Sequence, residues 1–269
     1  MNELQIRLLD MLAWYHDVCQ KENLRYFVLG GTALGTKRHS GFIPWDDDID
    51  VGMPRKDYEK FIHLGNKYGN KYVVEVPGQN KDFMYPYGKI YDTGTTLIEN
   101  TRFKIKRGIY IDVFPLDGAG NTLEESKKKF KETDKLINIL CTRSCALRPG
   151  RSFFKNAAIA LSRCIPEFIV NSQKLMKKID IISKRLDYDE CEYIANYAGN
   201  WHEKEISKRS WFGKPQLYKF EHLEVCGAED LDSYLTCMYG DYMTLPPVEK
   251  RVTHHDYIAM DLNKSYLED

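Results

Sequence analysis

Four aspartates in one short stretch have the side chains best suited to metal chemistry. Asp46, Asp47, Asp48 and Asp50 lead directly into Val51. Because side chains alternate faces along a strand, Asp48 and Asp50 share one face, which Asp46 joins if the strand begins early. Asp47 is expected to point away and to cap or orient the loop. Neighbouring carboxylates repel unless a cation lies between them, and Mg²⁺, with Mn²⁺ as the alternative, is the expected cation.

A glycine pair and a threonine precede these acids. The apolar run 26–29 ends in Gly30, Gly31 and Thr32. Glycine lets backbone N–H groups approach an anion closely, and the threonine hydroxyl can also donate a hydrogen bond. The glycines and the acids together predict a bound nucleotide. A solvated acidic loop is the alternative, but these acids run straight into a β-branched strand pattern.

Other charged residues are candidates for the same site. Asp112 is an acid inside a strand pattern otherwise suited to burial, so it should have a cation partner, and a salt bridge to an arginine is the alternative. Arg38 and His39 lie on the predicted loop between the glycines and the acids, where a guanidinium can grip a phosphate with two hydrogen bonds. Lys89 is a further candidate for phosphate, although single basic residues are usually solvated.

Four separated blocks of this sequence resemble the LicD family of phosphotransferases. This family belongs to the nucleotidyltransferase superfamily and is related to fukutin and the fukutin-related protein. Agreement across four blocks in the same order is more specific than any one of them. The blocks are GGTALG (30–35), RHSGFIPWDDDIDVGMPRKDYEKF (38–61), YIDVFPLDG (110–118) and YGDYMTLPP (239–247), the last followed by His254 and His255.

The resemblance implies roles for several residues. Asp48 and Asp50 would hold the metal ion, and Asp112 would join them as a third carboxylate that also helps to deprotonate the incoming hydroxyl. Arg38 and His39 match the block before the acids. The resemblance further implies that His254 and His255 reach the site as metal or phosphate ligands.

The activity implied by the resemblance is metal-dependent phosphotransfer. The enzyme would move phosphocholine from CDP-choline to a hydroxyl of a cell-surface glycan or teichoic acid precursor and would release CMP. Fukutin-type relatives use CDP-ribitol, so the transferred alcohol stays open. Two alternatives remain: a nucleotidyltransferase that adds NMP to a small molecule or sugar phosphate, and a non-catalytic nucleotide-binding module.

Composition and charge indicate a globular protein. The chain has 269 residues, 43% of them hydrophobic and 29% charged, with a net charge of zero. Residues 121–190 hold 15 basic and 9 acidic residues, a net charge of +6, which suits an anionic acceptor, a membrane surface or solvated helix faces equally. We expect a cytoplasmic protein with reduced cysteines, no signal peptide, no membrane span and no nucleic-acid partner. A peripheral contact with the inner face of the membrane is compatible with this.

The expected fold is α/β (α+β), with a nucleotidyltransferase-like mixed sheet and helices on one side of it. The pattern predicts a core over residues 1–120, a helical insertion over 121–190 that would suit a lid, and a segment over 191–269 that packs back on the core. The helices of this core are predicted near 3–22 and from Pro54 to Gly65 or Gly69, and its strands at 26–29, 48–51, 72–76, 89–91, 95–98 and 109–114. Short aromatic strands and turns over 192–226, with 211–213 among them, and a helix at 230–239 should follow.

Overall fold

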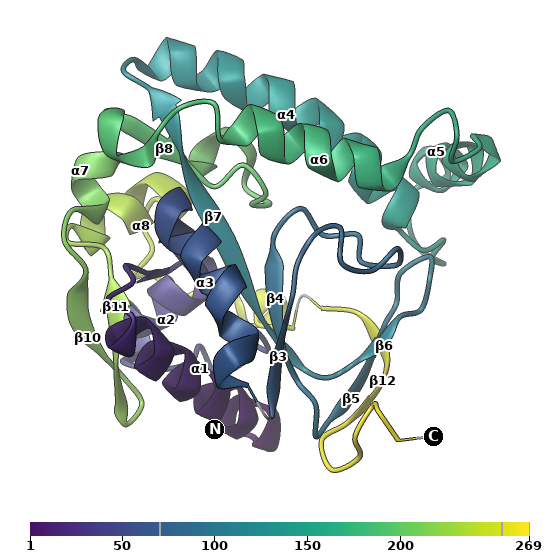
Figure 1. The fold of residues 1–269 in the computed structure, drawn as a ribbon. Helices are drawn as coiled ribbons and strands as arrows, with labels where there is room; N and C mark the ends of the chain where they lie inside the picture. Colours follow the sequence, from purple (N-terminus) through teal and green to yellow (C-terminus); the bar gives the residue numbers. More distant parts are fainter. Residues whose placement is uncertain (70, 254, 269) are drawn as a thin grey trace.

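The computed structural model describes residues 1–69, 71–253 and 255–268, arranged around a central mixed sheet (Figure 1). Its strand order is β1-β2-β7-β4-β3, and β8 and β9 continue it beside the far part of β7. Strands β2 and β7 run parallel, whereas the remaining pairs are antiparallel. This confirms the α/β prediction. The strands are β1 (Phe27–Val28), β2 (Asp50–Pro54), β3 (Tyr72–Glu75), β4 (Gly88–Asp92), β7 (Tyr110–Gly120), β8 (Tyr193–Ala195) and β9 (Ile206–Lys208).

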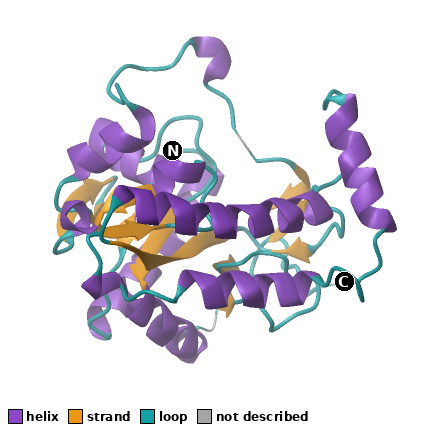
Figure 2. Cartoon of the chain, turned by 90° about the horizontal axis from the view of Figure 1, so that it is seen from above, coloured by secondary structure: helices purple, strands orange, loops and turns teal. Residues whose placement is uncertain are grey.

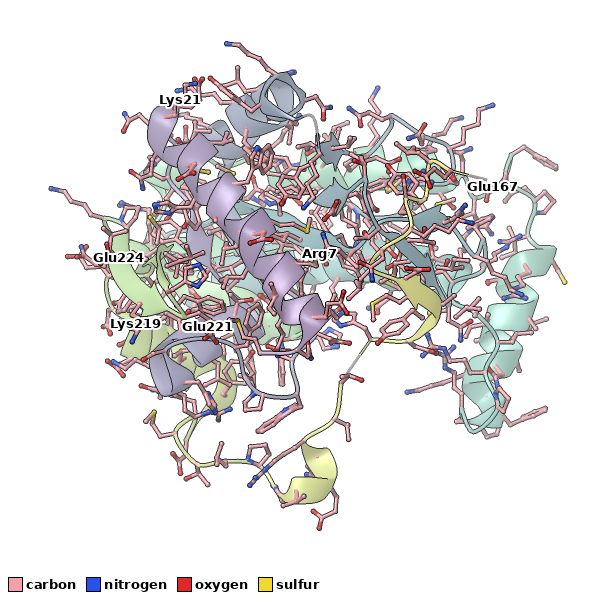
Figure 3. All side chains as sticks on the ribbon, turned by 90° about the horizontal axis from the view of Figure 1, so that it is seen from below. Arg7, Lys21, Glu167, Lys219, Glu221 and Glu224 are labelled. Atoms are coloured by element: carbon pink, nitrogen blue, oxygen red, sulfur yellow. The ribbon has the colours of Figure 1, made fainter. Side chains whose placement is uncertain are left out.

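Helix α1 (Glu3–Lys21) shows why the first segment folds as predicted. Its apolar side chains recur at helical spacing and are buried against the sheet, among them Leu8, Leu12 and Tyr15. Asn2 caps its first turn by accepting a hydrogen bond from the backbone of Gln5. Helix α3 (Arg55–Tyr68) packs beside it on β2, β3 and β7. Figure 3 shows α1 crossing the molecule between Arg7 and Lys21.

The segment 121–190 contains α4 (Leu123–Ser144), α5 (Phe153–Cys164) and α6 (Ser172–Ser183). Helices α4 and α6 lie side by side across one end of the sheet, and α5 projects at the right of Figures 1 and 2. No helix in the described part of the chain is long and apolar enough to cross a bilayer.

The chain after residue 191 adds small elements around the core. The hairpin of β10 and β11 and helix α8 flank β1 and α2. Strand β12 joins β5 in a separate three-stranded sheet. The remaining elements are α2 (Gly30–His39), β5 (Thr96–Glu99), β6 (Lys106–Arg107), η1 (Tyr188–Glu190), η2 (His202–Glu205), α7 (Arg209–Phe212), β10 (Gln216–Phe220), β11 (Leu223–Gly227), α8 (Leu231–Tyr239), η3 (Val248–Lys250) and β12 (Tyr257–Asp261).

Three local predictions differ from the structure. The predicted loop after Gly30 is helix α2, and residues 211–212, in a segment predicted to form short strands and turns, lie at the end of α7. Strand β7 was expected to stop at Pro115 but continues to Gly120. Proline lacks a backbone N–H. Here none is needed, because pairing with β4 ends at Val113 and pairing with β8 begins at Asp117.

A buried ion pair links the sheet to the helices above it. Arg55, the first residue of α3, contacts Asp117 of β7 at 2.6 Å and Asp180 of α6 at 2.9 Å. The Asp117 side chain is 1% exposed and that of Arg55 is 11% exposed. Loss of Arg55 would therefore leave the buried Asp117 carboxylate without its ion-pair partner, and loss of Asp117 would leave Arg55 with the partly exposed Asp180 alone.

We predict that Asp117→Ala lowers the free energy of unfolding by about 3 kcal/mol. Urea denaturation followed by circular dichroism measures this directly. Lys56→Ala is the matched control, because Lys56 follows Arg55 and makes a solvent-exposed ion pair with Asp187. The urea midpoint of Lys56→Ala should stay near that of the wild type. Equal effects of the two substitutions would refute the stabilising role of the buried Arg55–Asp117 pair.

Candidate active site

Strand register brings three charged residues from separate strands together. Asp50 on β2 lies opposite Asp112 on β7, and Lys89 on β4 lies opposite the same aspartate from the other side. Directly opposed residues point to the same face, with Cβ atoms roughly 5 Å apart. Lys89 Nζ accordingly lies 2.7 Å from Asp112 Oδ1. The cation beside Asp112 in the protein itself is thus a lysine and not the arginine considered from sequence.

Lys89 is enclosed by this arrangement. Its side chain is 1% exposed, and its ammonium group lies 3.3 Å from the ring centroid of Tyr110 and 4.2 Å from that of Tyr85. The Tyr87 hydroxyl donates to the second oxygen of Asp112 at 3.2 Å. The predicted phosphate-binding Lys89 therefore lines the site, but its charge is already directed at a carboxylate and at aromatic faces.

A second group of ligand atoms lies just before β2. Among the described residues, Asp47, Asp48 and His255 form the one group of three acid, histidine or cysteine side chains with ligand atoms within 4.8 Å of one another. His255 Nδ1 lies 2.9 Å from Asp47 and Nε2 lies 3.4 Å from Asp48. His254, predicted alongside His255, lies outside the described residues.

The position of Asp47 corrects the sequence interpretation. It was expected to point away from the other acids, yet its side chain lies among them and is 5% exposed. Strict alternation does not reach Asp47, because β2 begins only at Asp50. Its Oδ2 atom is buried and has no hydrogen-bond partner in the structure.

The clustered carboxylates carry negative charge that the protein only partly compensates. Burial, followed by repulsion from Asp48, raises the pKa of Asp46 to about 8. Burial and neighbouring acids also raise the pKa of Asp48 and of Asp50. Burial raises the pKa of Asp112, although Lys89 opposes that shift. Burial is the largest cause of each of these shifts, and repulsion between the neighbouring acids adds to it.

His255 responds to the same acids in the opposite direction. Burial lowers its pKa, but its hydrogen bond to Asp47 and its proximity to Asp48 outweigh burial and raise the pKa to about 9. In the protein alone, the imidazolium thus acts as a partner for this acid pair. A neutral imidazole at the same place would be a metal ligand.

The glycine pair lies against the acids at the start of α2. Gly30 has φ of +51°, which favours glycine, and its N–H donates to the Tyr234 hydroxyl at 3.0 Å. A Cβ at Gly31 would lie 2.9 Å from an Asp46 carboxylate oxygen. Both glycines line the cavity described below. Here they allow the helix N-terminus, with its partial positive charge, to approach the acids closely.

Thr32, Arg38 and His39 have positions that differ from those expected. The Thr32 hydroxyl is buried and accepts a hydrogen bond from the backbone N–H of Asp50 at 2.9 Å, so it holds the start of β2. Arg38 and His39 lie in the last turn of α2 instead of a loop. Arg38 donates to the backbone oxygen of Tyr242 at 2.8 Å. None of the three lines the cavity.

A cavity of about 390 Å³ opens over the acids. Its floor is formed by Asp47, Asp48, Asp50, Asp112 and His255. Its walls are lined by residues from the end of α4, from β5 with the loops beside it, from α8 and from the segment 196–205. Several polar or aromatic residues line these walls without having been predicted: Tyr85, Tyr87, Glu99, Trp201, Glu205 and Tyr234.

These additional residues differ in how far sequence could have revealed them. Glu205 is buried, and burial raises its pKa to about 7. It is 155 positions from Asp50, and no motif marks it. Glu99 accepts a hydrogen bond from the Tyr85 hydroxyl at 2.7 Å. An acid at the end of a strand pattern was the available signal for Glu99, and it is a weak one.

The residues of the floor fit a divalent cation. Oxygen ligands are provided by Asp47 and Asp48, and Asp50 and Asp112 lie on the same floor. Such an ion would give the unpartnered Oδ2 of Asp47 a contact, and its charge would offset the repulsion that adds to burial in raising the pKa values of Asp46, Asp48 and Asp50. Carboxylates with one imidazole suit Mg²⁺ or Mn²⁺.

Comparison with protein families gives one match, over residues 23–139, to the LicD/FKTN/FKRP nucleotidyltransferase domain. The matched stretch contains the glycine pair, all the clustered aspartates, Lys89 and Asp112. Residues 23–139 are a LicD-family domain. His255 and the cavity wall from α8 lie after this LicD domain, so the cavity is completed by the rest of the chain.

Curated relatives agree with the family match. The lipopolysaccharide cholinephosphotransferase LicD of Haemophilus influenzae is 28% identical over 264 residues, which cover 95% of this chain and 96% of that protein. An uncharacterized protein of Rickettsia typhi is 24% identical over 70% of this chain and 66% of that protein. Human ribitol 5-phosphate transferase FKRP is 42% identical over 40 residues, which are 15% of this chain and 8% of FKRP. These similarities confirm the predicted family and the prediction of a LicD-type transferase.

Proposed function

We propose that this protein is a metal-dependent phosphotransferase that moves phosphocholine from CDP-choline to a hydroxyl of a cell-surface glycan or teichoic acid precursor. One combined observation carries the proposal. The chain is similar along nearly its whole length to a lipopolysaccharide cholinephosphotransferase, and it has buried acids on the floor of a cavity. The family and this relative support phosphotransfer in glycan modification. The donor, the metal ion and the acceptor are inferences from the site.

The diphosphate of the donor would lie between the N-terminus of α2 and the acids. Gly30 and Gly31 line the cavity at the N-terminus of α2, where the Gly30 N–H is held by Tyr234, and helix N-termini favour negatively charged groups. Asp47, Asp48, Asp50 and His255 would hold the metal ion. When bound, the ion would offset the charge of the acids and of the diphosphate oxygens and so permit their close approach.

The proposed reaction is an in-line displacement at the phosphocholine phosphorus. A new bond forms between the acceptor oxygen and this phosphorus, and the bond from phosphorus to the bridging oxygen breaks, so that CMP leaves with that oxygen. Asp112 would accept the proton of the acceptor hydroxyl at a carboxylate oxygen. Lys89 favours the ionised form of Asp112, which that role requires.

Aromatic side chains of the cavity support choline as the transferred alcohol. The ammonium group of Lys89 already lies near the rings of Tyr110, Tyr85 and Tyr87, at 3.3, 4.2 and 5.7 Å from their centroids. Trp201 lines the same cavity. Lys89 occupies those tyrosine faces, so the fixed charge of choline would lie against Trp201, because an aromatic face attracts a cation more strongly than it attracts a polyol.

We predict that Asp48→Asn and Asp50→Asn each lower the transfer rate by at least about a thousandfold, because each removes a charge that would hold the metal ion and diphosphate. The assay is release of CMP from CDP-choline with Mg²⁺ and a choline-free glycan acceptor. Asp189→Asn is the matched control, since Asp189 pairs with Arg25 outside the cavity. Near-wild-type rates in either cavity variant would rule out the assigned roles.

Calorimetry should distinguish the donors and the rival reaction. With Mg²⁺ present, we expect CDP-choline to bind more tightly than CDP-ribitol, CDP-glycerol or CTP. The reason is that only choline has a fixed cation that can lie against an aromatic side chain of the cavity. Tight binding of CDP-ribitol with none of CDP-choline would overturn the choline assignment and leave the phosphotransferase class intact. Binding of CTP alone, with pyrophosphate as product, would instead favour a nucleotidyltransferase.

A further inference from the structure

Helix α5 and the residues after it expose an unusual amount of apolar surface. Phe153 and Phe154 are 80% and 81% exposed, and Phe168 is 86% exposed. We call the exposed set Phe153, Phe154, Leu161, Ile165, Phe168 and Ile169 the apolar face of α5. Large aromatic side chains gathered in this way on a surface indicate an interaction site.

The contacts of α5 with the rest of the protein determine which side of the helix is exposed. Ile159 and Ser162 are its buried residues, and the guanidinium of Arg143 on α4 donates to the backbone oxygens of Ser162 and Ile165. Phe154, Leu161 and Ile165 are spaced by seven and four residues, so they lie along one stripe of the helix and its extension. Figures 1 and 2 show α5 standing away from the sheet at one end of the molecule. Glu167, which follows α5 in the sequence, is labelled at this end in Figure 3.

The charge around this face is positive. No acidic residue occurs between Asp134 and Glu167, whereas Arg148, Arg151, Lys155 and Arg163 lie near or within α5. The carboxylate of Glu167 contacts Arg143 at 2.7 Å. Arg151 and Arg163 donate to backbone oxygens of Ala146 and Cys145, so these contacts do not neutralise their charge.

We propose that the apolar face of α5 inserts into the headgroup and acyl boundary of an anionic phospholipid bilayer. Phenylalanine and leucine on one side of a helix with arginine and lysine beside them are the combination that binds such a surface. A second copy of this chain or another protein would not require the basic border. The proposal does not depend on the identity of the donor or of the transferred alcohol.

The location of the face suits an acceptor presented at a membrane. Arg148 lines the cavity and contacts Asp256, the residue after His255, at 2.9 Å. Only the short segment 149–152 separates Arg148 from α5. Contact of α5 with the bilayer would therefore place the wall of the cavity near the lipid surface, where a lipid-linked hydroxyl could enter.

Flotation with lipid vesicles tests this binding without donor, metal or acceptor. Vesicles of phosphatidylglycerol and phosphatidylethanolamine should carry the full-length protein upward at low salt. Phosphatidylcholine vesicles should carry much less, and added salt should weaken the binding. The triple variant Phe154→Ser/Leu161→Ser/Phe168→Ser should bind the anionic vesicles about a hundredfold more weakly, because it loses apolar area available for insertion.

A matched triple variant separates this face from general surface hydrophobicity. Leu123→Ser/Ile181→Ser/Leu217→Ser changes residues that are 46%, 49% and 55% exposed on other elements, and it should float like the wild type. The proposal is wrong if the wild type does not bind anionic vesicles or if both triple variants bind equally well. It is also wrong if sedimentation shows that the wild type self-associates through this face and that vesicles recruit none of it.

Discussion

Buried negative charge beside the parallel pair of β2 and β7 sets the requirements for the rest of the site. The pairing register places Asp50 directly opposite Asp112, and the chain before β2 adds Asp47 and Asp48 to the same cavity floor. Lys89 compensates Asp112, and His255 compensates part of the charge of Asp47 and Asp48. The pKa values of Asp46, Asp48 and Asp50 nevertheless remain raised. We propose that a further cation, and with it an anionic donor, balances this charge.

Elements far apart in the sequence maintain this arrangement. The pairing of β12 with β5 brings the C-terminal segment across the cavity, and His255 lies just before β12. Tyr234 on α8 accepts the N–H of Gly30 and so fixes the start of α2 beside the acids. The LicD domain therefore contributes the carboxylates, while residues after it complete the wall and add the imidazole. This explains why the similarity to the cholinephosphotransferase extends well beyond the domain itself.

Sequence reasoning worked where local patterns determine structure and failed where contacts between distant segments do. Burial of an acid in an apolar strand pattern identified Asp112 as a site candidate. The grouping of Asp48 with Asp50 rested on strand alternation, which does not reach Asp48 because β2 begins at Asp50. The register that joins Asp50, Lys89 and Asp112 pairs residues that are 62 positions apart (Asp50 and Asp112) and 23 positions apart (Lys89 and Asp112), which no local pattern encodes. Asp47 was misplaced because alternation applies only within a strand. Thr32 looked like an anion ligand in the sequence, whereas backbone pairing uses its hydroxyl to hold the start of β2. Glu205 has no sequence signal, because its position depends on how the C-terminal segment packs.

Thermal unfolding of the wild type and of Asp48→Asn, each in EDTA and in Mg²⁺ or Mn²⁺, tests most directly whether this charge is built for a metal ion. Without metal, the variant should be at least as stable as the wild type, because one source of repulsion is gone. Saturating metal should raise the midpoint of the wild type, by about 2.7 kcal/mol of added stability at a hundred times the dissociation constant, and should leave the variant nearly unchanged. A wild-type midpoint insensitive to both ions, or a full metal response in Asp48→Asn, would contradict the account.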